Sequence, residues 1–167
     1  DKLTGRILTH ARSPLDRAAA LETRIRFQIS TFRLSDAVNT AAEALASIDV
    51  VLKDMTHPST LRTVASVLTS CWRLSRQGEF SLPPMTDEKH LAAMKLLMLM
   101  AHAAYISNDQ RITRIVLEMA DLSLRHGMAP ESSFAFPALG SVLINNLGPI
   151  DFGYRLGQIA LENLTDE

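Results

Sequence analysis

Apolar residues recur along most of the chain at the three- and four-residue spacing of α-helices, and no segment shows sustained alternation of apolar and polar residues. The pattern predicts helices separated by turns that contain Ser, Asp, Pro or Gly. The expected helices are 1–11, 15–32, 36–48, 60–76, 91–106, 112–125, 130–146 and 150–164. We therefore predict an all-α fold of antiparallel helical hairpins without a sheet.

Several helix ends carry recognisable start and stop signals. Ser13 before Pro14, with Asp16 three residues after the serine, predicts a capped start for the helix that follows. The other signals are a cap at Thr86, capping-box spacing at Ser107 and Gln110, a stop at Gly127, and Pro137 inside a helix that it should bend.

The most apolar stretch is LAAMKLLMLMAHAAYI, residues 91–106, in which apolar side chains occupy nearly the whole circumference of the predicted helix. A membrane span would need about 18 or more apolar residues. This stretch is shorter, Lys95 interrupts it, and charged residues precede it. We therefore expect a buried helix that other helices surround.

Composition limits the class of protein. The 167 residues are 47% hydrophobic with a net charge of −1, which favours one globular domain over 1–167 and gives no indication of a nucleic-acid or membrane partner. The one cysteine, Cys71, cannot form an internal disulfide, which suits a cytoplasmic protein. We expect Cys71 to be a buried apolar side chain; the alternative is a reactive thiol. The start at Asp1 suggests a piece of a longer protein.

Small residues near the C-terminus follow a regular order. Gly140, Gly148, Gly153 and Ala160 are separated by eight, five and seven residues. Glycines let two antiparallel helices approach closely and allow a tight turn between them. The segment 139–164 resembles one tetratricopeptide (TPR) helical hairpin, which has this order at nearly the same spacing. The alternative is an ordinary helical bundle with coincidental small residues.

The pattern of the second helix of such a hairpin recurs. Its small positions pair as Ala37 with Ala44, Thr113 with Ala120, and Gly153 with Ala160. In the first copy Phe32 stands where the turn glycine would be. The expected segments are a first TPR-like hairpin at 1–50, central long helices at 58–126, and a last hairpin at 129–165. The resemblance implies a short, degenerate TPR-like solenoid or bundle.

Longer stretches resemble the helical region of large multidomain bacterial signalling proteins, which join a protein-kinase-like domain, a STAND-type ATPase and a GAF, histidine-kinase or cyclase-type output. The resemblance lies in ARSPLDRAAALETRI, LPPMTD, MADLSLRHGMAPESSFAF and DFGYRLGQIALENL. The chain has no GxxxxGK[ST] phosphate loop and no HRD catalytic loop. The resemblance therefore implies a regulatory, non-catalytic segment that holds protein contacts.

Residues suited to other chemistry are few. The histidines are scattered without metal-ligand spacing, no serine or cysteine lies in a nucleophile motif, and we expect no metal or cofactor. Lys95 and His102 share a helix face because seven residues separate them. That face is either solvated or, with Tyr105, the lining of a small polar pocket.

Three functions remain to be distinguished. The first is a protein–protein or interdomain contact module that binds a helix or an extended segment between hairpins. The second is a small-ligand sensor or enzyme with a pocket at Lys95, His102 and Tyr105. The third is homodimerisation through the amphipathic face of 112–124. Arginines at 12, 17, 24, 26 and 33 are expected to form a solvated face.

Overall fold

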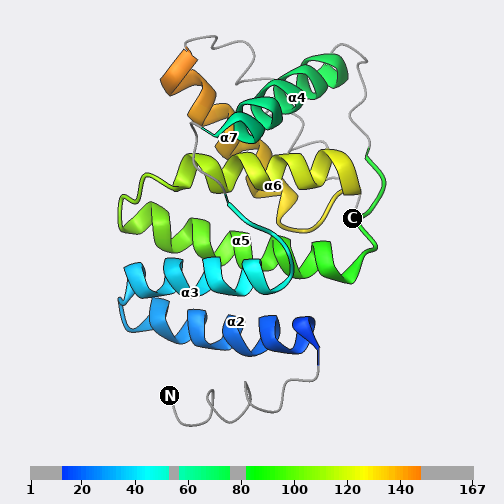
Figure 1. Ribbon diagram of the computed structural model, residues 1–167. Helices are drawn as coiled ribbons and strands as arrows, with labels where there is room; N and C mark the ends of the chain where they lie inside the picture. The colour runs from blue at the N-terminus through cyan, green and yellow to red at the C-terminus, as the bar shows by residue number, and fades with distance from the viewer. Residues whose placement is uncertain (1–12, 53–56, 76–81, 148–167) are drawn as a thin grey trace. The chain divides into compact units, whose positions relative to one another are not determined.

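The computed structural model describes residues 13–52, 57–75 and 82–147. These residues form six α-helices and no strand, which confirms the predicted all-α class. The helices expected at 1–11 and 150–164 lie outside the described residues. The bounds are α2 Pro14–Ser30, α3 Leu34–Ser47, α4 Pro58–Ser75, α5 Glu88–Ile106, α6 Ile112–His126 and α7 Ser132–Leu147 (Figure 1).

Contacts divide the chain into two compact units. The first unit comprises Asp1–Leu52 and Asp87–Ile115, and the second comprises Lys53–Thr86 and Val116–Glu167. Helices α2, α3 and α5 belong to the first unit, whereas α4, α7 and most of α6 belong to the second. The segment 58–126, expected to hold the central helices, therefore contributes to both units.

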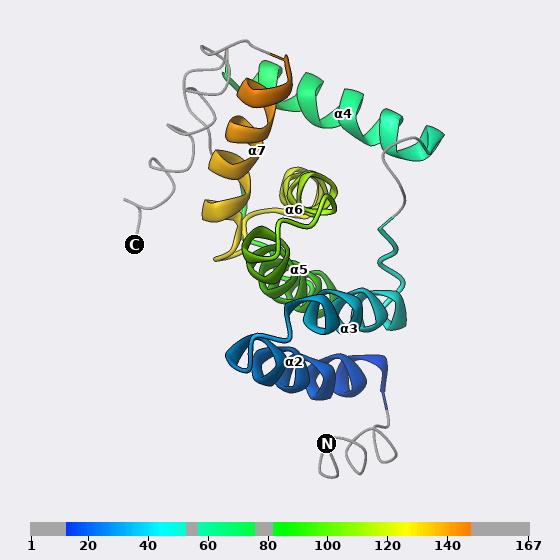
Figure 2. The same cartoon turned by 90° about the vertical axis from the view of Figure 1, so that its left-hand side faces the viewer.

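In the first unit α3 packs against both α2 and α5, and α2 also contacts α5. Helices α2 and α5 run in the same direction and α3 runs in the opposite one (Figures 1 and 2). Ala37, Ala41 and Ala44 of α3 are completely buried. Because these side chains are short, α3 can approach its neighbours closely, while Leu21 and Leu45 fill the core beside them.

Two of the predicted helix starts differ in the structure. Ser13 and Asp16 form the predicted capping box of α2. The cap of α5 is Asp87 and not Thr86, because the Asp87 carboxylate directly precedes the helix and accepts a hydrogen bond from the backbone N–H of His90 at 2.9 Å. The capping box predicted at Ser107 is also wrong: its hydroxyl donates to the carbonyl of Ala103 at 2.8 Å, so Ser107 ends α5 and does not begin α6.

Helices α2, α3 and α5 end in the same way, without glycine. In each case the second residue after the helix has positive φ: 55° at Phe32, 60° at Asp49 and 53° at Asn108. The next residue donates its N–H to a carbonyl five residues earlier, as in a Schellman motif. These bonds are Arg33 to Gln28 at 2.8 Å, Val50 to Leu45 at 2.9 Å, and Asp109 to Ala104 at 2.8 Å.

The second unit contains the predicted stop at Gly127, which follows the end of α6 with φ of 99°. The next residue, Met128, forms an isolated parallel bridge with Pro84. A Cβ atom at Gly127 would lie 2.3 Å from the carbonyl oxygen of Pro83, so only glycine fits there. Pro137 lies inside α7, as predicted.

Helix α5 is not surrounded on all sides, which corrects the expectation for 91–106. Its buried side includes Met94, Leu97 and Met100, each with no exposed surface. Lys95 and His102 are exposed, however, and the apolar residues beside them are only half-buried. The uncovered strip exists because α2 and α3 cover only part of the circumference of α5 within this unit.

Candidate functional site

One strip of α2 borders the uncovered side of α5. Helix α2 begins at the Ser13 capping box, and its Leu21 and Ile25 face the core. Residues three and four apart on the neighbouring strip, from Leu15 through Glu22 to Ile29, remain partly accessible. The periodicity of α2 therefore separates a core face from a face that borders α5.

The matching strip of α5 begins at Glu88 and ends at His102. Leu91, Lys95 and Leu99 lie between them at helical spacing. The two leucines are half-buried and Lys95 is exposed. Fourteen residues separate Glu88 from His102, so the strip is about 21 Å long at the α-helical rise of about 1.5 Å per residue.

Two hollows follow one another along these strips, and together we call them the α2–α5 groove. The first has a volume of about 300 Å³ and the second about 360 Å³. The first is lined mainly by apolar side chains, and the second by apolar and polar side chains in equal number. The first is lined by Leu15, Ala18, Ala19, Glu22, Glu88, Leu91, Ala92, Lys95 and Leu96, and the second by Arg26, Ile29, Ser30, Met98, Leu99 and His102.

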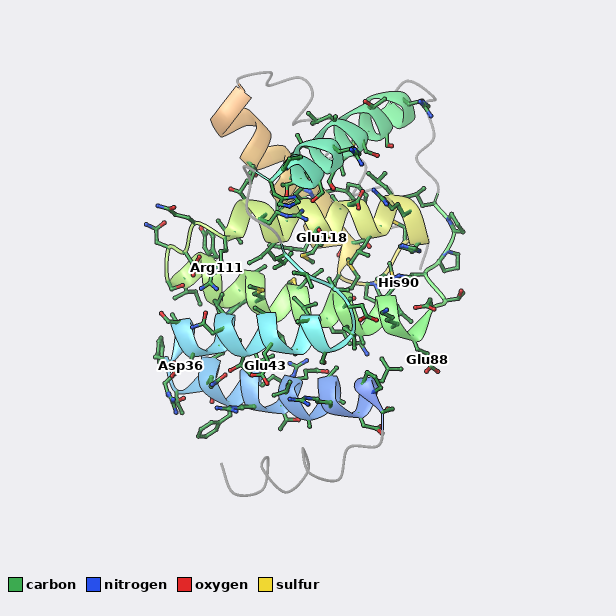
Figure 3. The ribbon with its side chains drawn as sticks, in the orientation of Figure 1. Asp36, Glu43, Glu88, His90, Arg111 and Glu118 are labelled. Carbon is green, nitrogen blue, oxygen red and sulfur yellow. The ribbon has the colours of Figure 1, made fainter. Side chains whose placement is uncertain are left out.

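The charges of the groove are unevenly matched. Arg26 donates from Nε and Nη2 to Oε1 of Glu22, at 3.0 and 2.8 Å, so this pair is neutral overall. Within the described residues, Lys95 has neither an ion pair nor a hydrogen bond. Glu88 stands at the N-terminal end of α5, where Figure 3 shows it at the edge of the unit. The groove therefore carries a cation near its centre and an anion at one end.

The three residues considered for a polar pocket are not brought together in one cavity. Lys95 lines the first hollow and His102 the second. Tyr105 is 78% exposed and lines neither hollow. The shared face of Lys95 and His102 is accessible to water, and on α5 itself the apolar Met98 and Leu99 lie between them.

The small residues of the predicted repeat have different surroundings. Ala37, Ala44 and Ala120 are completely buried, Gly140 is buried, and Thr113 is half-buried. Gly148, Gly153 and Ala160 lie outside the described residues. The described small residues therefore lie where helices are covered, and none of them lines the groove.

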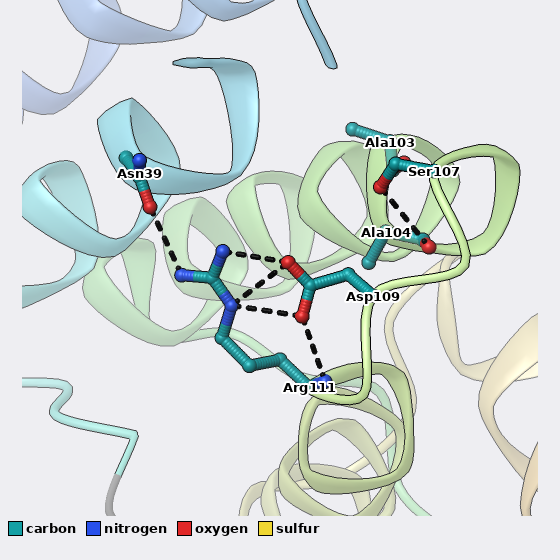
Figure 4. A network of polar contacts seen from close by, with 6 residues as sticks. All are labelled: Asn39, Ala103, Ala104, Ser107, Asp109 and Arg111. Atoms are coloured by element: carbon teal, nitrogen blue, oxygen red, sulfur yellow. Dashed lines mark hydrogen bonds and ion pairs between the residues drawn. The ribbon is translucent and has the colours of Figure 1, made fainter. Parts of the chain in front are cut away.

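A polar cluster that sequence analysis did not identify holds the chain after α5. Arg111 donates to both carboxylate oxygens of Asp109 and, through Nη1, to the side-chain oxygen of Asn39 at 3.0 Å (Figure 4). Its guanidinium lowers the pKa of Asp109, chiefly by hydrogen bonding. The cluster joins α3 to the α5–α6 turn, so its role in the described structure is to fix that turn. Only the Asp–X–Arg spacing could have indicated the ion pair in advance.

Other candidate chemistry finds little support within the described residues. The Cys71 thiol is buried, and burial raises its pKa to about 12, so it is not a nucleophile at neutral pH. No group of three or more His, Cys, Asp or Glu side chains in the described ranges is placed to hold a metal ion. No helix in those ranges combines the length and hydrophobicity needed to cross a membrane.

The structure also describes the arginines that were expected to be solvated and the helix α6 that was considered for dimerisation. Three arginines of α2 and the following turn are exposed and pair with carboxylates: Arg17 with Glu43, Arg26 with Glu22, and Arg33 with Asp36. Arg24 is half-buried and forms no ion pair within the described residues. Arg12 lies outside the described residues. On α6, Ile115, Val116 and Met119 are buried within the chain. That apolar face is therefore already covered.

Comparisons with protein family models, with curated proteins and with solved structures find no match for this chain. The groove is therefore interpreted from its own geometry.

Proposed function

We propose that this chain is a non-catalytic, TPR-like interaction module of a larger signalling protein, and that it binds a segment of another protein or domain in the α2–α5 groove. The observation that carries the proposal is the parallel course of α2 and α5 with α3 packed against both. A TPR-like repeat has a similar spatial arrangement: the first helices of successive hairpins run side by side, and the second helix of the first hairpin packs against both. In this chain α4 separates α3 from α5 along the sequence. The resemblance to signalling proteins quoted above supports the wider role.

The groove has the surface that a protein segment requires. Its floor is formed by helices whose other faces are fixed in the core, so it needs little rearrangement to bind. Leu91 and Leu99 are half-buried and can be covered further, which would remove apolar surface from water. An amphipathic helix that lies in a groove is recognised by such apolar positions, with charged residues setting its register. A partner helix of about 15 residues matches the groove length of about 21 Å.

The groove is better suited to a protein segment than to a small molecule. Each hollow is near the lower limit of about 300 Å³ for small-molecule sites, and most of its apolar lining residues are still partly exposed. A partner helix can cover both hollows at once. Tyr105, the aromatic residue expected to complete a polar pocket, lies outside both.

Selection from a display library of helix-favouring peptides about 15 residues long would test the proposal. Ala19 is exposed and lines the first hollow, so Ala19→Trp should obstruct the groove without removing a core side chain. Ala46 is an exposed alanine of α3 outside the groove, and Ala46→Trp is the matched control.

We expect peptides selected on the unmodified chain to bind the Ala46→Trp variant equally well and the Ala19→Trp variant at least about 10-fold more weakly, a loss of about 1.4 kcal/mol. Circular dichroism would show that both variants remain folded. A library without binders, or binders indifferent to Ala19→Trp, would refute the proposal. A small metabolite that raises the melting temperature of the unmodified chain, but not of the Ala19→Trp variant, would favour a ligand sensor instead.

A further inference from the structure

Most of the lysines and arginines in the described part of the first unit are paired within it. Five of these eight side chains form ion pairs with carboxylates of the same unit. The pairs are Arg17–Glu43, Arg26–Glu22, Arg33–Asp36, Lys89–Asp49 and Arg111–Asp109. An unmatched cation in such a surface is therefore informative.

Lys95 is the cation of the groove without a partner. Within the described part of the first unit, Arg24 is likewise without an ion pair, but Arg24 lines neither hollow. Glu22 lines the same hollow as Lys95, but its carboxylate already accepts two hydrogen bonds from Arg26. The ammonium of Lys95 thus stands midway along an apolar groove without a counter-charge.

A partner segment that covers this groove also covers the ammonium of Lys95. A wholly apolar segment would remove water from Lys95 without replacing the hydrogen bonds, which is unfavourable. A carboxylate placed opposite Lys95 would restore them with a charge-assisted bond. Glu88, two helical turns earlier on the same strip, would repel a carboxylate placed at that end. The charge pattern therefore selects both the partner and its register.

We infer that the α2–α5 groove recognises an amphipathic helix of a partner protein whose apolar stripe is interrupted by one Asp or Glu, and that this carboxylate pairs with Lys95. The inference rests on the proposed function, because it specifies the partner of the same groove. Lys95 is a specificity-determining residue in this account, whereas Leu91 and Leu99 provide apolar contact.

The selected peptides described above supply the first readout. We expect Asp or Glu to be enriched at one position of the apolar stripe, and not at the position two turns away toward the Glu88 end. The second readout is a charge reversal: Lys95→Glu should weaken a selected acidic peptide by about 10-fold or more, and a peptide with Lys at the acidic position should regain affinity for that variant.

Two further variants separate charge from shape and position. Lys95→Met keeps most of the side-chain stem and removes the ammonium, so it should weaken the acidic peptide by about 10-fold and have no effect on a peptide with Gln at that position. Lys89→Met is the matched control on the same helix, because Lys89 pairs with Asp49 and lines neither hollow. It should leave affinity for the acidic peptide unchanged.

The outcomes distinguish this inference from the proposed function. Peptides that bind the groove without acidic enrichment, and with equal affinity for the Lys95→Met variant, would overturn the inference and leave the proposed function standing. A library without groove binders would overturn both. Sedimentation that shows a dimer of this chain, lost with Ala19→Trp, would make a second copy the occupant and would also overturn the inference.

Discussion

The helix end at Phe32 provides a sharp test of the backbone. Phe32 has φ of 55° and is 81% exposed, so a bulky side chain occupies a left-handed conformation with little packing to stabilise it. The left-handed conformation costs a residue with a Cβ atom roughly 1–2 kcal/mol, and glycine almost nothing. Only about a fifth of the residue is covered, so loss of the ring costs at most ~1 kcal/mol, for a side chain of about 200 Å².

The strain of the left-handed backbone and the packing of the ring predict different results for two substitutions. Phe32→Ala loses the packing of the ring but keeps the strain, so we expect the free energy of unfolding to fall by up to about 1 kcal/mol. Phe32→Gly loses the same packing and also relieves the strain, so it should be about 1 kcal/mol more stable than Phe32→Ala. Urea unfolding followed by circular dichroism measures the difference as a change of midpoint at constant slope.

The exposed Ala19 in the interior of α2 is the control. There the backbone is right-handed, and Ala19→Gly should destabilise by about 0.5–1 kcal/mol. Glycine is thus favoured over alanine at position 32 and disfavoured at position 19. If Phe32→Gly proves less stable than Phe32→Ala, position 32 does not have the left-handed conformation and the reasoning fails.

Three other predictions concern the remaining parts of the chain. Gly127→Ala should lower the free energy of unfolding by at least about 2 kcal/mol in urea, because its Cβ meets the Pro83 carbonyl at a positive φ; an unchanged midpoint would count against that contact. The pKa of Asp109 is lowered in the folded state, so its contribution to stability is present above about pH 4 and declines as the pH falls through the lower folded value. The difference in unfolding free energy between the unmodified chain and the Asp109→Asn variant should therefore shrink on acidification. A difference that does not change with pH would contradict this prediction. Cys71, with a pKa raised to about 12, should resist thiol reagents in the folded protein and react once urea unfolds it; rapid labelling of the folded protein would refute its burial.

Local signals were sufficient to predict the six helices of the described residues and several of their ends. The Ser13 capping box and the stop at Gly127 both appear as predicted, because each depends on residues within a few positions of one another. Such features need no knowledge of which helices become neighbours.

The groove could not be predicted from the same signals. Residues 91–106 are apolar on nearly every side, and only the positions of α2 and α3 decide that the Lys95 strip stays uncovered. The hydrogen bond from Arg111 to Asn39 joins residues far apart in sequence, so periodicity does not reveal it. At Phe32 the hydrogen bonds of the turn impose a conformation that its residue type disfavours. Tertiary packing decides the first two cases, and the local hydrogen bonds of the turn decide the third.

The most direct test of the central claim is a map of where a selected acidic peptide binds. Backbone amide signals of the labelled chain, followed by NMR during titration with the peptide, would provide it. The account predicts that the largest shifts follow the two strips of the groove, from Leu15 to Ile29 on α2 and from Glu88 to His102 on α5, and that they diminish with Lys95→Met. Shifts confined to the second unit, or to the α3 surface around Ala46, would contradict it.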